Sequence, residues 1–372
     1  MLFGVISMVS VTALLVMYLY FTVGEGYNFR QALKEKKEGE TLSEEAPPEP
    51  KKKEDSESLA EPVAGEEESP TEQKAGETEM DAAERAAYEE ELREDARAKL
   101  LADMKAFMQQ ENSTVKLLRQ FYPDDVVVFS NATYNFVPVD PEITPTSHDP
   151  ELFVMDEETG RFSYTDPNVT THFGIDVSKF QTRIDWQKVA SEGVEFALIR
   201  LGLRGYSEGA IMLDETYEYN IDNAAANGIH TGVYFFSQAK NKEEAKEELD
   251  FVFENLEGHE CDGPIVIDIE DVNDGKGRTG GLSVTERTEI TKYFCEEVIK
   301  KGREPMIYGN LKSFILMLDL KELEEYSKWY AFYDVPVYYP YDYDILQYSD
   351  TGRLAGISGD VDLNLAFKVW YE

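Results

Sequence analysis

Two carboxylates stand two residues apart at the end of an apolar run in this 372-residue chain. The run Pro264–Ile267 leads directly into Asp268, Ile269 and Glu270, which is typical of a buried strand that reaches the edge of a sheet. Residues i and i+2 of a strand point to the same side, so both carboxyl groups should face one site. Such a pair can divide the work of cleaving a glycosidic bond, one protonating the leaving oxygen while the other stabilises or attacks the oxocarbenium centre. Alone, the motif also fits a solvated strand end or a helix cap.

Two further acids, Asp176 and Asp362, are also predicted to end strands. In a barrel of parallel strands, the active site collects at the carboxyl ends of the strands. Like charges brought together raise the pKa of at least one member, which is what a general acid needs near neutral pH. We therefore interpret the four acids as a catalytic cluster. This chemistry requires no metal and no organic cofactor, because two carboxyls suffice.

Repeated strand–helix units are expected to position these acids. Apolar runs at 173–177, 196–200, 231–236, 264–270 and 305–308 alternate with helix-like segments near 184–192, 214–228, 241–257, 284–302 and 319–327. Such alternation predicts parallel strands with covering helices. After Trp329 the helices fade, and strands are expected near 330–333, 345–348 and 361–362. The predicted fold class is α/β, with an irregular barrel of five strand–helix units and about three further strands over residues 171–372.

From His172 to Glu372 the sequence resembles glycoside hydrolase family 25, the lysozymes that act as N-acetylmuramidases. Each motif alone would prove little, but several occur in the family's order, which makes the resemblance specific. They are Gly174-Ile175-Asp176-Val177-Ser178-Lys179-Phe180-Gln181 with Ile184-Asp185-Trp186, Gly232-Val233-Tyr234-Phe235-Phe236, Asp268-Ile269-Glu270, Ile307-Tyr308, Trp329-Tyr330-Ala331-Phe332-Tyr333, Gln347-Tyr348-Ser349 and Gly359-Asp360-Val361-Asp362-Leu363-Asn364.

The resemblance implies roles for the acids. Glu270 would be the general acid. Asp268 would be the second carboxylate, acting as nucleophile or positioning the substrate's own acetamido group. Asp176 and Asp362 would line the same pocket, tuning its charge and orienting the sugar.

The resemblance also implies a set of substrate contacts. Arg200 ends the second strand and is expected to pair with one of the acids or to meet the substrate. Phe235 and Leu346 depart from the family, which often carries His and Trp at these places, and the departures bear on substrate preference more than on activity. Trp186 and Trp329 are interpreted as core. The implied sugar contacts are Tyr234, Tyr308, Tyr333 and Gln347.

The implied activity is hydrolysis of the β-1,4 bond after N-acetylmuramic acid in peptidoglycan. Two alternatives stay open. A chitinase-like hydrolase of another β-1,4 N-acetylhexosamine glycan is disfavoured, because Val266 stands where such enzymes typically carry the first Asp of an Asp-x-Asp-x-Glu run. A catalytically retired cell-wall-binding or scaffolding protein is disfavoured by the presence of all four acids.

The chain before the barrel divides into four predicted segments. Residues 1–23 lack charge and as a helix would be about 35 Å long, so we expect an uncleaved transmembrane anchor. Residues 24–80 are rich in Glu, Lys, Ser and Pro and predict a disordered charged linker. Residues 81–120 predict an amphipathic helical segment, and residues 121–170 a small β-containing module. The apolar stripe of the helix would be Tyr88, Leu92, Ala96, Leu100, Met104 and Met108.

The net charge of the chain limits its partners, and the charges that follow the expected anchor bear on its orientation in the membrane. The net charge of −38 excludes nucleic acid as a partner, because phosphate backbones require basic patches. Peptidoglycan would have to be bound by shape, stacking and hydrogen bonds. Arg30 and Lys34 follow the anchor and would place the barrel in the cytoplasm by the positive-inside rule. The implied cleavage of cell-wall glycan favours the opposite orientation. We therefore expect a single-pass membrane protein with an extracellular catalytic domain.

The two cysteines, Cys261 and Cys295, are too few for a disulfide scaffold and do not have the pattern of a zinc site. Two buried thiols or one disulfide would both fit the sequence.

Overall fold

The computed structural model describes residues 81–272 and 275–371. The expected anchor at 1–23 and the expected linker at 24–80 lie outside these residues. Across the described ranges, no helix is both long and apolar enough to cross a membrane. The chain divides into two units, one ending at Thr114 and the other spanning Val115–Glu372.

Helix α3 (Ala82–Glu111) belongs to the first unit. Asp81 starts it with a capping box, in which its carboxylate accepts from backbone N–H groups of the first turn. The predicted helix is therefore present, but none of its residues is buried, and Tyr88 and Leu92 are 53% and 45% exposed. The expected stripe recurs every four residues rather than every 3.6, so it drifts around the helix. The single apolar face that we expected does not form.

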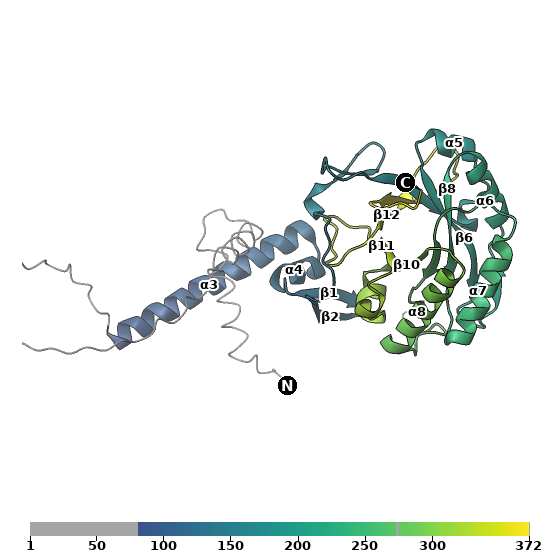
Figure 1. Cartoon of the computed structure of the whole chain (residues 1–372). Coiled ribbons are helices and arrows are strands. Elements are labelled where there is room, and N and C mark those ends of the chain that lie inside the picture. The colour runs from purple at the N-terminus through teal and green to yellow at the C-terminus, as the bar shows by residue number, and fades with distance from the viewer. Residues whose placement is uncertain (1–80, 273–274, 372) are drawn as a thin grey trace, which may run out of the picture. The chain divides into compact units, whose positions relative to one another are not determined.

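The second unit is built on a closed barrel of eight strands among the described residues (Figure 1). The strand order around the barrel follows the chain, and neighbouring strands from β5 to β12 are parallel. The last strand, β13, runs antiparallel to both of its neighbours, β12 and β5, and so closes the barrel. The strands are β5 (His172–Val177), β6 (Phe196–Arg204), β8 (His230–Phe236), β9 (Ile265–Asp268), β10 (Pro305–Asn310), β11 (Ser327–Ala331), β12 (Ile345–Gly352) and β13 (Val361–Ala366), with β7 (Ile211–Leu213) added to the edge of β6.

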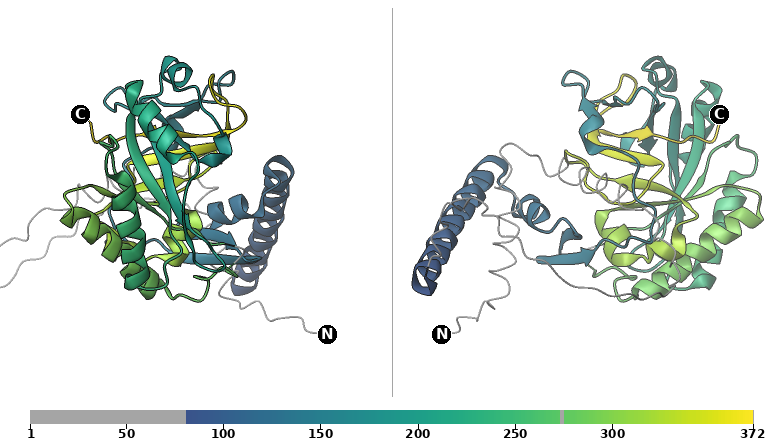
Figure 2. Two further views of the ribbon diagram at one scale, coloured as in Figure 1. Left: turned by 90° about the vertical axis from the view of Figure 1, so that its right-hand side faces the viewer. Right: turned by 60° about the vertical axis from the view of Figure 1, so that its left-hand side comes forward.

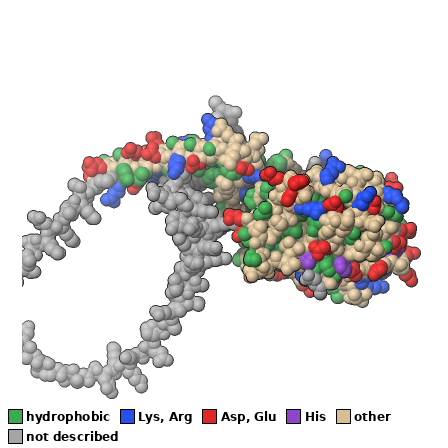
Figure 3. All heavy atoms as spheres, turned by 90° about the horizontal axis from the view of Figure 1, so that it is seen from above, with side chains coloured by type: hydrophobic (Ala, Val, Ile, Leu, Met, Phe, Trp, Pro, Cys, Tyr) green, Lys and Arg blue, Asp and Glu red, His purple; other side chains and the backbone are tan. Residues whose placement is uncertain are grey.

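Helices cover the first strands from outside (Figures 1 and 2). They are α5 (Trp186–Ser191), α6 (Tyr217–Ala226), α7 (Lys242–Leu256) and α8 (Val284–Lys300). After β10 the chain forms only the short helical turns η3 (Ser313–Met317) and η4 (Leu320–Leu323). The predicted α/β class and irregular barrel are confirmed. The helix expected near 319–327 is present only as the short turn η4, because β11 must begin at Ser327 to pair with Met306. Acidic and basic side chains are interspersed on the face seen in Figure 3.

Strands β11 to β13 lack such helices, and the segment that precedes the barrel packs on them instead. It contains α4 (Thr114–Phe121), β1 (Asp125–Ser130), β2 (Thr133–Pro138), η1 (Pro150–Leu152), β3 (Phe153–Met155) and β4 (Phe162–Tyr164). The backbone N–H of Val127 donates to the hydroxyl of Tyr338 at 3.0 Å. The rings of Phe162 and Tyr348 stack with their centroids 4.5 Å apart. Short strands therefore form where the β-containing module was predicted, within the same compact unit as the barrel.

The end of the barrel at which the strands begin is filled by the C-terminal segment. Trp370 packs edge-to-face on Phe196, with ring centroids 5.5 Å apart, and Tyr371 stacks on His230 at 3.8 Å. Gly174 makes room for this packing, since a Cβ there would lie 2.2 Å from the Phe196 ring. The interior at this end is apolar, so polar chemistry is confined to the opposite end.

Candidate active site

The four predicted acids gather at the end of the barrel opposite this plug. Asp176 and Asp268 lie at the carboxyl ends of β5 and β9, and Glu270 follows two residues later. Asp362 reaches the same end from the start of β13, because β13 is antiparallel; the prediction that it ends a strand is wrong, although its placement at this rim is right. Burial raises the pKa of all four carboxyls, and repulsion by neighbouring acids adds to the rise for Asp268, Glu270 and Asp362.

Asp176 lies at the centre of a hydrogen-bond network. Its Oδ2 accepts from Gln347 Nε2 at 2.7 Å and from Asn364 Nδ2 at 2.8 Å. Burial raises the pKa of Asp176, while these two bonds and one from Asp362 oppose the rise. Burial first, and then repulsion by Asp176, raises the pKa of Asp362 to about 9. Asp362 therefore holds a proton at neutral pH and donates it in a hydrogen bond to Asp176.

Asp268 and Glu270 form the second half of the cluster. Asp268 is 5% exposed, and within the described chain its Oδ1 has no hydrogen-bond partner. Burial raises its pKa well above the usual range, with Glu270 and Asp176 adding to the rise and Arg200 opposing it. Burial and the charge of Asp176 also raise the pKa of Glu270. Carboxyls that keep protons at higher pH than usual can act as general acids.

Three of the four predicted sugar contacts lie in contact with this cluster. Gln347 Oε1 accepts from the hydroxyls of Tyr308 and Tyr333 at 2.8 and 2.6 Å, so both tyrosines are linked through Gln347 to Asp176. Tyr333 is 50% exposed and Tyr308 is buried. The fourth, Tyr234, lies within reach of the charge of Asp176, which adds to the rise in the tyrosine's pKa caused by burial.

Arg200 does not form its ion pair with any of the four acids. Its Nε and Nη2 both lie 2.7 Å from Oδ2 of Asp214, whose side chain is fully buried. Arg200 also lies 5.2 Å from the ring centre of Phe180, which is 71% exposed at the rim. Sequence reasoning missed Asp214, and no pattern marked it, because it reaches Arg200 from the turn between β7 and α6.

The two departures from the family pattern lie away from the acids. Phe235 and Leu346 are fully buried in the apolar layer outside the barrel, because they alternate with the inward residues Tyr234 and Gln347. Neither side chain reaches the site. Trp329 is buried as predicted, and its Nε1 also donates to Asn364 Oδ1 at 2.7 Å, which orients the amide bound to Asp176. Sequence reasoning had not singled out Asn364 itself, although it ends one of the quoted motifs.

Among the described residues, no group of three or more His, Cys, Asp or Glu side chains is arranged to hold a metal ion. Cys261 and Cys295 are both free thiols, so of the two alternatives the disulfide does not form.

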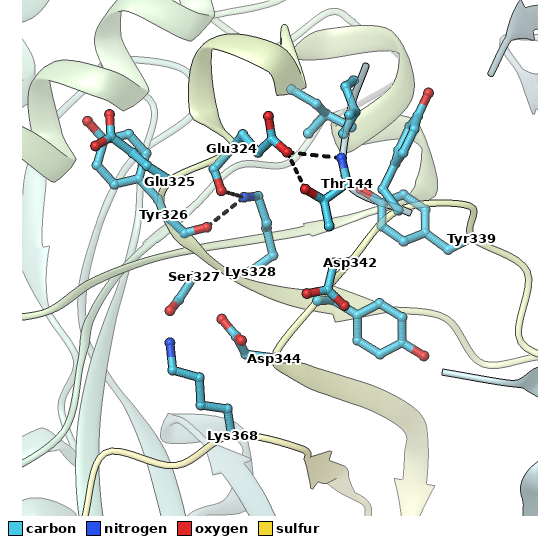
Figure 4. Close-up of a pocket in the computed structure, with 14 residues that line it drawn as sticks. Thr144, Glu324, Glu325, Tyr326, Ser327, Lys328, Tyr339, Asp342, Asp344 and Lys368 are labelled. Carbon is cyan, nitrogen blue, oxygen red and sulfur yellow. Dashed lines mark hydrogen bonds between the residues drawn. The ribbon is translucent and has the colours of Figure 1, made fainter. Parts of the chain in front are cut away.

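A separate cavity of about 180 Å³ lies where β11 and β12 begin (Figure 4). Its polar groups are largely occupied with one another: Lys328 Nζ donates to the backbone oxygens of Glu324 and Tyr326, and the Thr144 N–H donates to the Glu324 carboxylate. None of the four predicted acids lines it. The rim that carries Asp268 and Glu270 is therefore the candidate active site.

Comparison with known proteins finds a family model, sequence relatives and a solved structure. Residues 175–357 match the model of glycosyl hydrolases family 25, a range that holds Asp176, Asp268 and Glu270 and ends just before Asp362. Lysozyme M1 of Streptomyces globisporus is 32% identical over 202 residues, covering 51% of this chain and 66% of that protein, just under two thirds of its length. The uncharacterized protein YegX of Escherichia coli O6:H1 is 30% identical, covering 55% of this chain and 72% of that protein. The solved bacterial lysozyme of Streptomyces coelicolor is 27% identical with a TM-score of 0.43, covering 54% of this chain and 92% of that one.

Proposed function

The chain belongs to glycosyl hydrolases family 25, and from that premise we propose that it hydrolyses the β-1,4 bond between N-acetylmuramic acid and N-acetylglucosamine in peptidoglycan. One observation carries the proposal. At one rim of the barrel Asp268 is buried and Glu270 is partly buried, and the pKa of each is raised by burial and by at least one neighbouring carboxylate. Two such carboxyls are the minimal apparatus for cleaving a glycoside.

In this proposal Glu270 is the general acid. The charge of Asp176 and the burial of the site favour its protonated form, so it can donate a proton to the glycosidic oxygen as the bond to the anomeric carbon breaks. Asp268 carries an oxygen that has no partner among the described residues. That oxygen can accept a hydrogen bond from the N–H of the substrate's acetamido group, or it can attack the anomeric carbon as the nucleophile.

The surrounding residues position the substrate and the charges. Asp176 is held as an acceptor by Gln347 and Asn364, and its negative charge raises the pKa of Glu270. Tyr333, with half of its surface exposed and its hydroxyl fixed by Gln347, offers a flat apolar ring to a sugar. Tyr234 and Tyr308 line the base of the same site.

The substrate also suggests a location. Peptidoglycan lies outside the cell membrane, so the barrel would work there, and the charge-free residues 1–23 would supply a single-pass anchor. The full chain should then stay with the membrane fraction after washing at high salt. Release by salt alone would contradict the anchor without affecting the proposed activity.

Muropeptide analysis tests the function itself. Purified peptidoglycan is incubated with the full chain or its Glu270→Gln variant, and the new reducing ends are identified by mass spectrometry. The matched control is Glu289→Gln, which changes an exposed glutamate on α8. We expect muramic acid ends from the wild type and the control, and none from Glu270→Gln. Glucosamine ends would overturn the assigned bond, and an absence of product from every protein would favour the wall-binding alternative.

A further inference from the structure

A cavity of about 350 Å³ lies beside the candidate active site, between the hairpin of β1 and β2 and the chain that follows β9. The hairpin lies before the family match, so this cavity joins a segment outside the match to the catalytic rim. Figure 1 shows the hairpin beside the short helical turn that follows β10. Its polar lining consists mainly of Ser130, Asn131, Asn135, Asp271, Arg287 and Lys312.

The cavity and the active site share one stretch of backbone. Glu270 interacts electrostatically with Asp176 at the barrel mouth, whereas the next residue, Asp271, forms an ion pair with Lys312 in the cavity wall. Adjacent residues thus serve two adjoining sites. A ligand that occupied the cavity would lie against Asp271, which follows the residue proposed to donate the proton.

The charge of the cavity contrasts with that of the whole chain. Two cations, Arg287 and Lys312, face one carboxylate, Asp271, in a protein with a net charge of −38. Arg287 is mostly buried, and its Nη2 donates to the backbone oxygen of Thr279 at 2.8 Å. Burial lowers its pKa and Asp271 opposes that change, so the buried guanidinium would gain from a further anion.

The hairpin tip supplies neutral polar groups from the other side. Asn131 and Ala132 have φ values of 51° and 57°, the left-handed pair typical of a tight two-residue hairpin turn. An alanine in this left-handed conformation is strained. Ser130 is buried beside this turn, and within the described residues its hydroxyl has no hydrogen-bond partner.

We propose that this cavity is a subsite for the carboxylate of a short peptide attached to the glycan next to the bond that is cut. Lys312 and Arg287 would bind the carboxylate, as cationic side chains commonly do. Leu282, Val284 and Leu316 line the rest of the cavity and suit small aliphatic side chains. A sugar fits less well, because the lining contains no aromatic ring on which it could stack. The inference rests on the proposed function, since it assigns part of the same polymer to a second site.

Two variants of opposite effect test the subsite. Lys312→Met removes a cation from the cavity, and Asp271→Asn removes the competing carboxylate. Lys292→Met is the control, because it breaks an exposed ion pair with Glu322. The full chain acts on two substrates, a glycan that carries peptides with free carboxylates and the same glycan after an amidase has removed them. On the first substrate we expect Lys312→Met to raise KM about fivefold or more and Asp271→Asn to lower it. On the second substrate neither KM should change.

Equal changes of KM on both substrates would overturn the subsite. A direct binding measurement distinguishes failure of the subsite proposal from failure of the proposed function. N-acetylmuramoyl-alanyl-glutamate, and the same compound with its carboxylates amidated, are titrated calorimetrically into the wild type and the Lys312→Met variant. Tighter binding of the acidic form, lost in the variant, supports the subsite even if the protein cleaves no glycan. Equal binding of both forms by the wild type contradicts it, whatever the activity.

Discussion

Asp362 and Asp176 face each other as directly paired residues of the antiparallel strands β13 and β5, and the carboxyl of one donates a hydrogen bond to the other. Two carboxyls in this position share one proton, which lies on Asp362 because burial and Asp176 raise its pKa to about 9. The remaining charge on Asp176 is held by two amides. That charge adds to the rise in the pKa of Asp268 and Glu270 that burial causes first, so the Asp176–Asp362 pair influences the protonation of the other two acids.

Asp362→Asn should make folding less sensitive to pH. Asp362 has an ordinary pKa of 3.8, raised to about 9 in the fold. The stability that its proton contributes is fully present below about pH 4 and is lost as the pH rises towards 9. Asparagine keeps a neutral donor at every pH. The calorimetric Tm of the variant, relative to that of the wild type at the same pH, should therefore rise from pH 5 to pH 8. A difference independent of pH would contradict the shared proton.

Asp176→Asn should shift the alkaline limb of the pH–activity profile to lower pH. Glu270 must be protonated to act as an acid, so activity falls as the pH rises through its pKa. The charge of Asp176 raises that pKa, and its removal lowers it. The measurement is kcat/KM against pH. Asp360→Asn, which removes an exposed carboxylate paired with Arg353, should leave the limb in place. An unmoved limb in Asp176→Asn would rule out this tuning.

Gln347→Leu should destabilise the fold by roughly 2–3 kcal/mol, because it removes the acceptor of two tyrosine hydroxyls and a donor to buried Asp176. Tyr333→Phe is the milder comparison. It removes one of these bonds at a half-exposed side chain, so about 1 kcal/mol is expected. Urea unfolding of both variants gives the comparison. Similar losses of unfolding free energy in the two variants would show that Gln347 is not the centre of the hydrogen-bond network.

Trp370→Ala should lower the free energy of unfolding by about 3 kcal/mol, since it empties part of the plug beneath Phe196. The folded variant should keep its kcat, because the plug lies at the end of the barrel opposite the acids. Lys368→Ala, at an exposed position in the same segment, should cost less than about 0.5 kcal/mol. A large fall in kcat with unchanged stability would mean that the plug acts on the catalytic end.

Strand periodicity predicted the placement of the candidate site residues where alternation alone decides which way a side chain points. Asp268 and Glu270 face one site because strand side chains alternate. The same rule, which the sequence analysis did not apply to Phe235 and Leu346, places both outside the barrel, so neither bears on substrate preference as expected. Arg200 shows the limit of this reasoning. Its partner Asp214 comes from a turn after an edge strand, and only packing brings the two together.

Two predictions about helices hold only in part, for different physical reasons. The segment near 319–327 has helix-forming residues, but the pairing of Ser327 with Met306 takes its end into a strand, so tertiary contacts override local propensity. In α3 the apolar residues recur every four positions. The helix completes a turn in slightly fewer residues, so these side chains do not stay on one face. The docking of residues 121–170 could not be read from the sequence either, because its contacts lie about two hundred positions away.

The position of the β1–β2 hairpin also imposes an order on folding. Val127 is bonded to Tyr338, 211 residues later, and Asp176 to Asn364, 188 residues later. At about 5–20 residues per second of translation, the hairpin leaves the ribosome roughly 10–40 s before the surface that receives it. The barrel cannot close until its last strand is synthesised. Val126 and Val128, buried in the finished protein, therefore lack the surface that receives the hairpin throughout that interval.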